Sequence, residues 1–273
     1  MTRFSTFLML AIGIMTMVTT PSNAGQMQGY IADFINPATL SDVDADTAAV
    51  GIPPAYAGCA FAPPNVVFGV GFTSGLSYAG SALYGIEWDG VDIYLYSFDA
   101  SGCAVGNRVG ASPVGAANLE SLAYCPIDGF FYSVDFDFAA PHLGQLVRID
   151  PLTGIGTPIG SHMSPDVRIV GMVCDGNGLL WAVTSGFASR NPELLNVDRT
   201  TGVETLIGPL GLPANEVESL AVDPATPFSL FAAGKALYAV NAATGAASLV
   251  GGSYETVYAM AGTDLFFFGN FEP

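Results

Sequence analysis

Short apolar runs alternate with tight polar turns along most of this chain, and no long amphipathic helix is recognisable. Three segments align with one another: Leu122–Asp135, Gly171–Thr184 and Leu220–Ala233. In each, an apolar run leads through a turn of Pro, Gly, Asp or Asn into a second apolar run, which is typical of a β-hairpin. Tyr132, Trp181 and Leu230 fall at matching places, so the hairpins repeat every 49 residues.

A second motif follows each hairpin. It contains an Asp/Asn-x-x-Thr-Gly turn and ends in Ile-Gly or Val-Gly; the three copies of the turn segment are Leu146–Gly154, Leu194–Gly202 and Leu237–Gly245, and a divergent copy is Tyr94–Gly102. The Asp or Asn side chain can cap the turn, and glycine allows the positive φ that the return strand needs. Each repeat therefore predicts two hairpins, or four short strands.

Four short strands repeated along the chain predict an all-β protein, a β-propeller with about five four-stranded blades, or six. Val257–Gly269 resembles the first half of a blade and Tyr30–Thr39 the second half, so we expect the two ends to pair and close the ring. Residues 57–75 fit no complete blade. A large β-sandwich is the alternative, but it does not explain the 49-residue offset.

The whole pattern resembles exported bacterial β-propeller repeat proteins of the YVTN, NHL and SMP-30-like kind, over roughly residues 57–270. This resemblance implies a fold and no particular chemistry, because propellers serve many functions. The last residues, Asp264–Pro273, are similar to short tails of some exported proteobacterial proteins, and they also suit an edge strand.

The N-terminal residues predict export. Arg3 precedes a short apolar run, Phe7–Val18, and Ser22 and Ala24 place small residues at a cleavage site. We expect residues 1–24 to be a signal peptide and residues 25–273 to form a single propeller domain in the periplasm or outside the cell. The alternative, a membrane anchor, requires ~20 apolar residues, which is more than this run contains.

The net charge restricts the expected binding partners, and the cysteines raise the question of disulfide pairing. The formal charge is −17, with one lysine, Lys235, so a nucleic acid is not expected as a partner, and no later segment predicts a membrane span. Exported proteins can keep disulfides, and four cysteines allow three pairings, or they remain free thiols. Cys125 and Cys174 occupy equivalent positions in adjacent repeats, which favours their pairing and leaves Cys59 with Cys103.

The sequence gives little indication of a metal-binding site. No CxxC motif or Cys/His cluster suggests zinc. Asp42, Asp44 and Asp46 have the spacing of the first ligands of a Ca²⁺ loop, but Thr47 stands where glycine is required and Pro53 where glutamate is required. A solvated acidic turn is the simpler interpretation, and we expect no cofactor.

Propeller topology gathers two sets of loops on one face, which we call the polar face: those before first strands and those between second and third strands. The candidate ligand-binding residues there are Trp88, Asp89, Glu120, His142, His162, Arg168, Arg190 and Glu218. We expect a non-catalytic propeller that binds a neutral or weakly anionic ligand, or a partner such as a glycan or protein, on this face through exposed arginines. The alternative is a secreted hydrolase of lactones or esters with a metal at the channel mouth.

Overall fold

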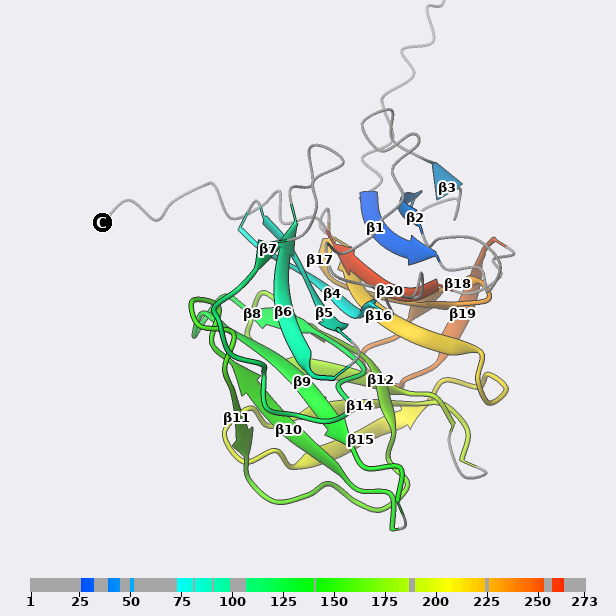
Figure 1. The fold of residues 1–273 in the computed structure, drawn as a ribbon. Helices are drawn as coiled ribbons and strands as arrows, with labels where there is room; N and C mark the ends of the chain where they lie inside the picture. The colour runs from blue at the N-terminus through cyan, green and yellow to red at the C-terminus, as the bar shows by residue number, and fades with distance from the viewer. Residues whose placement is uncertain are drawn as a thin grey trace, which may run out of the picture.

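The computed structural model describes residues 26–31, 39–44, 50–51, 73–80, 82–89, 91–98, 107–139, 141–186, 190–223, 226–252 and 257–262. The regular structure over these ranges is strand only (Figure 1). They include no helix that is long and apolar enough to cross a membrane. The predicted signal peptide, Cys59 and Cys103 lie outside the described residues.

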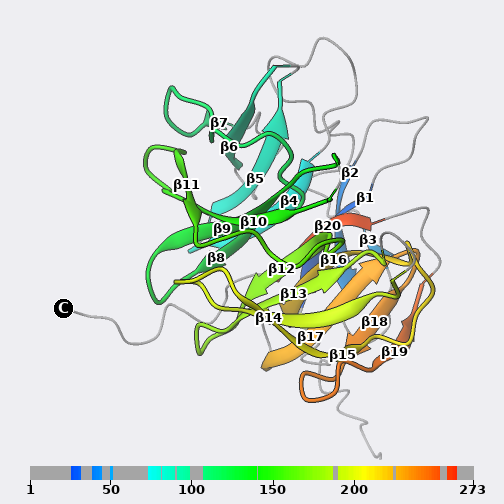
Figure 2. The ribbon, with the colours of Figure 1, turned by 90° about the horizontal axis from the view of Figure 1, so that it is seen from below.

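Four antiparallel sheets, each of four consecutive strands, form the blades of a β-propeller (Figures 1 and 2). Blade 1 contains β4 (Thr73–Ala79), β5 (Ala82–Trp88), β6 (Ile93–Phe98) and β7 (Asn107–Arg108). Blade 2 contains β8 (Ala123–Cys125), β9 (Phe130–Phe136), β10 (Gly144–Ile149) and β11 (Gly156–Ile159). Blade 3 contains β12 (Ile169–Cys174), β13 (Leu180–Thr184), β14 (Glu193–Val197) and β15 (Glu204–Pro209). Blade 4 contains β16 (Val217–Asp223), β17 (Thr226–Gly234), β18 (Leu237–Val240) and β19 (Ala247–Gly251).

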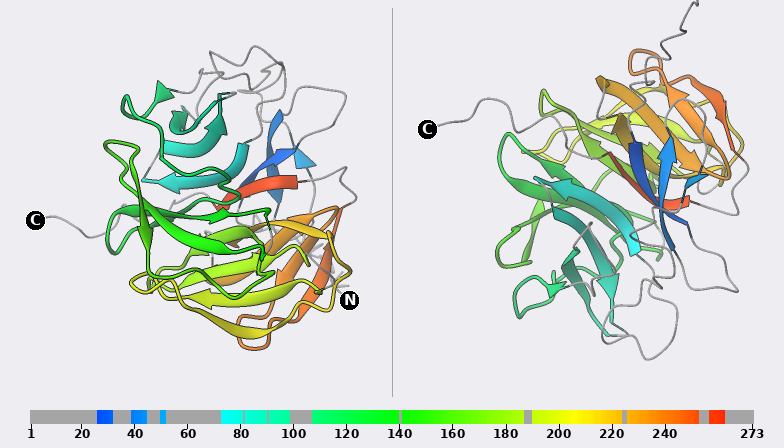
Figure 3. Two further views of the ribbon diagram at one scale, coloured as in Figure 1. Left: turned by 60° about the horizontal axis from the view of Figure 1, so that its bottom comes forward. Right: turned by 90° about the horizontal axis from the view of Figure 1, so that it is seen from above.

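A further four-stranded sheet combines segments from far apart in the sequence. It has the order β20-β1-β2-β3, with β20 at Val257–Gly262, β1 at Gln26–Ile31, β2 at Thr39–Asp44 and β3 at Val50–Gly51. Strand β20 pairs with β1 and lies beside β4 and β16. In Figure 3 this red strand crosses next to the blue β1, between the cyan and orange sheets. We call this the mixed sheet.

The blade count differs from the expectation of about five, or six. Four blades are built from consecutive strands. The four blades of consecutive strands extend from Thr73 to Gly251, and the other described strands, β1–β3 and β20, form the mixed sheet. Among the described residues, this sheet takes β20 from the expected C-terminal segment and three strands from the N-terminal segment; the rest of Val257–Gly269 lies outside the described residues.

The innermost strands approach closely because a glycine of one blade faces the backbone of the next. A Cβ added at Gly171 in β12 would lie 2.5 Å from the backbone nitrogen of Leu220 and 2.6 Å from the carbonyl carbon of Ser219 in β16. Gly75 of β4 meets the backbone at Leu122 in the same way. Leu122 and Leu220 are both buried, so glycine and leucine alternate at this level of the four blades.

Successive copies of the second motif contact each other across blade boundaries. As predicted, the turns are capped by Asp or Asn. The side chains of Asp150, Asp198 and Asn241 accept hydrogen bonds from the backbone N–H groups two and three residues further along the chain. The glycines of these turns, Gly154, Gly202 and Gly245, have φ values of 72°, 72° and 80°. Each turn packs against the outer strand of the preceding blade, where Gly110, Gly160 and Gly208 leave no room for a Cβ beside the threonine carbonyl. Each repeat therefore keeps this turn and this glycine because the turn of one blade packs against the glycine of the preceding blade.

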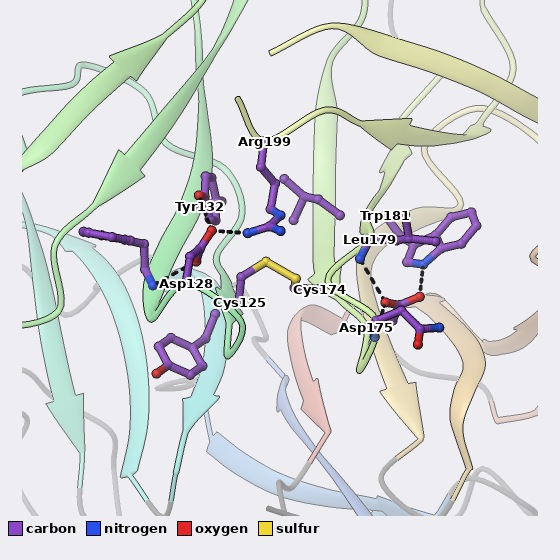
Figure 4. Close-up of a disulfide and its surroundings, with 12 residues drawn as sticks. Cys125, Asp128, Tyr132, Cys174, Asp175, Leu179, Trp181 and Arg199 are labelled. Carbon is purple, nitrogen blue, oxygen red and sulfur yellow. Dashed lines mark hydrogen bonds and ion pairs between the residues drawn. A yellow bond between two sulfur atoms is a disulfide. The ribbon is translucent and has the colours of Figure 1, made fainter. Parts of the chain in front are cut away.

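A disulfide joins Cys125 of blade 2 to Cys174 of blade 3, which confirms the favoured pairing (Figure 4). The two Cα atoms are 5.2 Å apart, within the range that a disulfide spans. On the same side of the molecule, Arg199 forms an ion pair with Asp128, which also accepts a hydrogen bond from the Tyr132 hydroxyl. Blades 2 and 3 are thus cross-linked both covalently and by charge where their hairpins meet.

Candidate functional site

The central feature of the polar face is an ion pair between two adjacent blades. Glu120 precedes β8 and Arg168 precedes β12, so propeller topology brings these distant residues to neighbouring positions. The Nε and Nη2 atoms of Arg168 donate to the two carboxylate oxygens of Glu120, each at 2.7 Å. This two-point geometry is the strongest arrangement for an arginine and a carboxylate. With side chains 24% and 15% exposed, the pair is partly sheltered from water.

Glu218 extends this pair into a cluster that spans three blades. It lies in β16 of blade 4, the strand whose Ser219 and Leu220 meet Gly171 of β12, and the charges of Arg168 and Glu120 both act on its pKa. The side chain is half-buried, and no hydrogen bond or ion pair holds it among the residues described. Lys235, which is exposed, also influences Glu218 without lying within 4 Å of it. We call Glu120, Arg168 and Glu218 the axial cluster.

Burial and charge act in opposite directions on the pKa of Glu218. Burial raises it by disfavouring the carboxylate, Arg168 and Lys235 lower it, and Glu120 raises it further; the net direction is upward. The pKa of Arg168 is also raised: burial lowers it, but the hydrogen bonds and charge of Glu120, assisted by Glu218, outweigh that cost. The arginine stays charged, and the cluster carries one negative charge in excess when both glutamates are ionised.

The loops that surround the axial cluster hold distinctive backbone conformations. His142 (φ 55°) lies between β9 and β10, Asp166 (φ 63°) between β11 and β12, and Asn215 (φ 59°) between β15 and β16. Within the described ranges, they are the non-glycine residues with positive φ, and all three belong to the polar face. The N–H of Asp166 donates to the carbonyl of His142, which ties two of these loops together beside Arg168. Such conformations concentrate at functional sites, although Asn, Asp and His adopt them more readily than most residues.

Sequence reasoning missed an aromatic residue of this site. Phe138, 47% exposed in the β9–β10 loop, lies with its ring centre 5.4 Å from the Arg168 guanidinium carbon. Its ring packs edge-to-face against Phe136, which fixes its orientation. Phe138 has no counterpart in a repeated motif and lies 30 residues from Arg168, so nothing in the sequence linked the two.

The other candidate residues lie in separate surroundings. Asp89 follows β5 and accepts hydrogen bonds from the backbone N–H groups of Val91 and Asp92. It also forms an ion pair with Arg108, whose guanidinium stacks on the ring of Tyr94. Trp88, next to Asp89 in the sequence, is exposed. Arg190, between β13 and β14, pairs with Glu193 at 2.9 Å. His162 is exposed in the β11–β12 loop that also holds Arg168. The structure therefore brings Glu120, Arg168 and Glu218 together, with His142 on an adjoining loop, but shows no contact of Trp88, Asp89 or Arg190 with them.

Arg168 is more buried than expected, whereas the exposure of the Arg190 side chain is in line with the expectation. Both are already neutralised by glutamates, at 24% and 40% side-chain exposure. A lone sequence shows where arginines fall in the loops, but not which carboxylate another blade will place opposite them. Replacing Arg168 would therefore disturb stability as well as any binding.

The acidic turn expected at Asp42–Asp46, which was also the weak calcium candidate, differs from the structure as well. Asp42 and Asp44 lie in β2, where they pair with Gly51 of β3 and Gln26 of β1, so these two residues belong to a strand; Asp46 lies outside the described ranges. Among the residues described, no three His, Cys, Asp or Glu side chains are placed to hold a metal ion.

Glu218 provides a prediction about pH. A carboxyl group whose pKa is raised in the folded state costs stability as pH rises from its ordinary pKa, about 4.3, through the raised value. We expect Glu218→Gln to be modestly more stable than the parent at pH 7, with the difference disappearing below pH 4. Urea unfolding at both pH values measures this, and lower stability of the variant at pH 7 would contradict it.

No protein-family model matches the sequence, and no curated protein does either. Solved structures similar to this chain include one from a nidogen/laminin complex, with a TM-score of 0.50 and 9% identity over 87% of this chain and 98% of the other. TolB from Acinetobacter baumannii matches with a TM-score of 0.52 and 15% identity over 88% of this chain and 66% of its own. At these identities the likeness supports the propeller fold alone.

Proposed function

We propose that this chain is an exported, non-catalytic β-propeller that binds a ligand or partner on its polar face, with the axial cluster at the centre of the binding site. The single observation that carries the proposal is Glu218: a half-buried carboxylate without a hydrogen-bond donor among the described residues, next to a satisfied ion pair. A carboxylate that is not fully buried and that no described donor holds remains open to a hydrogen-bond donor supplied by a ligand.

Two further features support a binding role. In the loops around the cluster, His142, Asp166 and Asn215 adopt positive φ, and a backbone hydrogen bond from Asp166 to His142 joins two of these loops. Loops that are already ordered lose less entropy when a ligand binds. The exposed ring of Phe138 offers apolar contact area beside the charged groups. A hydrolase with a metal at the channel mouth was the alternative, and it would need convergent metal ligands that the described residues do not supply.

The test uses binding and turnover together. A panel of small cationic, neutral and anionic compounds is titrated against the ¹⁵N-labelled protein, and amide shifts are followed for residues 118–122, 166–170 and 216–220. We expect at least one class to shift these residues and to lose affinity in Glu218→Gln, whereas Asp128→Asn, on the opposite side, serves as the matched control. Turnover of lactone or ester substrates that depends on Glu120 or Glu218 would overturn the proposal.

The proposal includes the closure of the ring by the mixed sheet. The support is that β20 pairs with β1 while lying beside β4 and β16. Gly29 and Met260 are direct partners across β1 and β20. Cysteines introduced at both positions should therefore cross-link, and peptide mapping without reductant detects the bond. Failure to form this bond, while the Cys125–Cys174 bond persists, would contradict the closure.

A further inference from the structure

The Cys125–Cys174 disulfide lies at the base of two tight turns that touch each other. Cys125 ends β8, and its carbonyl accepts the N–H of Gly129 across the β8–β9 turn. Cys174 ends β12 and leads into the β12–β13 turn, which contains Gly178. A Cβ added at Gly178 would lie 2.5 Å from Cδ1 of Ile127. Two residues beyond one cysteine, Ile127 therefore crosses from blade 2 to the turn that the other cysteine begins.

An ion pair makes a second crossing beside Ile127. Arg199 lies in the β14–β15 turn of blade 3, and its Nη1 atom pairs with Oδ2 of Asp128 in the β8–β9 turn of blade 2. The other terminal nitrogen, Nη2, lies 3.2 Å from the same Cβ position at Gly178. Ile127 and Arg199 therefore meet over one glycine, which has no side chain to hold them apart.

Tyr132 connects this crossing to the disulfide. It belongs to the same buried cluster as Cys125 and Cys174. Its hydroxyl donates to Asp128 at 2.8 Å, and the guanidinium carbon of Arg199 lies 5.9 Å from its ring centre (Figure 4). The side chains of Arg199 and Asp128 are 21% and 29% exposed, whereas the two cysteines are 0% and 7% exposed. The ion pair thus lies on the solvent side of the cluster that contains the bond.

We propose that Ile127, Asp128 and Arg199 form a strap that closes over the disulfide and keeps external thiolates away from it. Reduction begins when a thiolate attacks one sulfur: a mixed disulfide forms, the S–S bond breaks, and the other sulfur leaves as a thiolate that takes a proton from water. A second thiol of the reductant then displaces the remaining cysteine, so the reductant supplies both electrons and ends as its own disulfide. The first attack requires access to a sulfur, and it therefore waits for the strap to open.

The strap makes the link between blades 2 and 3 sensitive to ionic strength. A partly exposed ion pair weakens as salt screens its charges. Salt should therefore open the strap more often and speed the reduction of a bond that itself carries no charge. This device is independent of the proposed binding function.

The experiment follows reduction by dithiothreitol in the full-length folded protein. Alkylation and peptide mass spectrometry count the thiols of Cys125 and Cys174, and each rate is divided by that of the urea-unfolded protein at the same salt concentration. We expect the folded protein to be reduced about a hundredfold more slowly than the unfolded one, because the open state is a minor one. Addition of 1 M NaCl, a concentration at which the Debye length is about 3 Å, should speed reduction of the folded protein about threefold.

Arg199→Gln is the decisive variant, because shielding and charge predict opposite results. Loss of a cation makes the surroundings more negative, which repels a thiolate and slows its attack. Loss of the strap exposes the bond. We expect reduction about fivefold faster than in the parent, the factor that one partly exposed ion pair contributes, with no further acceleration by NaCl. Asp128→Asn should act alike, and the double variant should be no faster than either single variant, since all three lose the same pair.

Two controls match these changes. Arg148→Gln removes the same charge from blade 2, but Arg148 stacks on Phe130 and takes part in no ion pair among the described residues, so its rate should change less than about twofold. Ile127→Ala removes the apolar part of the strap and should speed reduction about threefold. Leu152→Ala removes a similar side chain from the other turn of blade 2, where it is 84% exposed, and should leave the rate unchanged.

Urea separates opening of the strap from unfolding of the whole protein. Opening exposes little surface, so reduction should be nearly constant at urea concentrations below the unfolding transition. A rate that follows the unfolding equilibrium would mean that thiolates reach the bond only in the unfolded chain, and the strap would be overturned. Reduction of Arg199→Gln at the parent rate or more slowly overturns it as well. If that variant does not fold, the parent decides: reduction that NaCl does not accelerate refutes the strap.

Discussion

Gly171→Ala is expected to destabilise the protein by about 3 kcal/mol, because it inserts a methyl group where two backbones already touch. The added Cβ would lie 2.5 Å from the Leu220 nitrogen and 2.6 Å from the Ser219 carbonyl carbon, distances that real Cβ atoms do not adopt. Since the obstacle is backbone in β16, no side-chain rotation relieves it. The innermost strands of blades 3 and 4 must separate, and the buried residues around them lose contact.

Urea unfolding of Gly171→Ala measures this loss, and Gly176→Ala is its matched control. Gly176 lies in the β12–β13 turn at ordinary φ, and a Cβ there meets no atom within 4 Å. We expect the control to be as stable as the parent or slightly more so, because alanine restricts the unfolded chain. Adding Leu220→Ala should not rescue Gly171→Ala, as it would if side-chain crowding were the cause. A Gly171→Ala protein as stable as the parent would mean that the two strands are not held at this separation.

The local architecture was predictable because its causes are local. Asp150, Asp198 and Asn241 cap turns through atoms two and three residues away, and Gly154 takes its positive φ within the same turn. These interactions leave a motif of fixed length in every repeat. The hairpins and their order follow from such motifs, and the disulfide follows from the equivalent positions of Cys125 and Cys174 in the first motif.

Contacts between repeats were not predictable in the same way. Arg168 and Glu120 are 48 residues apart, and nothing near Arg168 in the sequence indicates that a carboxylate of the preceding blade will neutralise it. Gly171 and Gly160 look like ordinary strand and turn glycines, yet both are required by backbone from another blade. The repeat predicts that the loops holding Glu120 and Arg168 lie on one face, whereas the pairing of these two side chains depends on long-range placement that the sequence does not indicate.

The mixed sheet illustrates the same limit. Its strands were expected at Tyr30–Thr39 and Val257–Gly269, but β1 covers Gln26–Ile31 and β2 begins at Thr39. The register of β1 is determined by β2 on one side and β20 on the other, with an irregularity between Tyr30 and Ile31. A short segment whose pairing partner lies more than 200 residues away has no local pattern that fixes its ends.

Removal of the disulfide by Cys125→Ala with Cys174→Ala should lower the free energy of unfolding by about 4 kcal/mol, the entropy expected for a loop of this length. The bond closes 49 residues of sequence, and it does so between the innermost strands of two blades. Both cysteines are buried, at 0% and 7% exposure, so the bond also fills space in the core that β8 and β12 share.

The same bond bears on the candidate site, because β8 and β12 are tied at both ends. Cys125 lies five residues beyond Glu120, and Cys174 six residues beyond Arg168, so the disulfide and the ion pair join the two strands at opposite ends. In the double variant, amide exchange should therefore rise at residues 118–122 and 166–170 as well as near the lost bond. Unfolding in a strong reductant is the control: once the parent is reduced, its stability should fall to that of the double variant. If the parent and the double variant unfold alike without reductant, the bond does not brace these blades, and the geometry of the axial cluster is maintained by the Glu120–Arg168 ion pair and the interlocked turns alone.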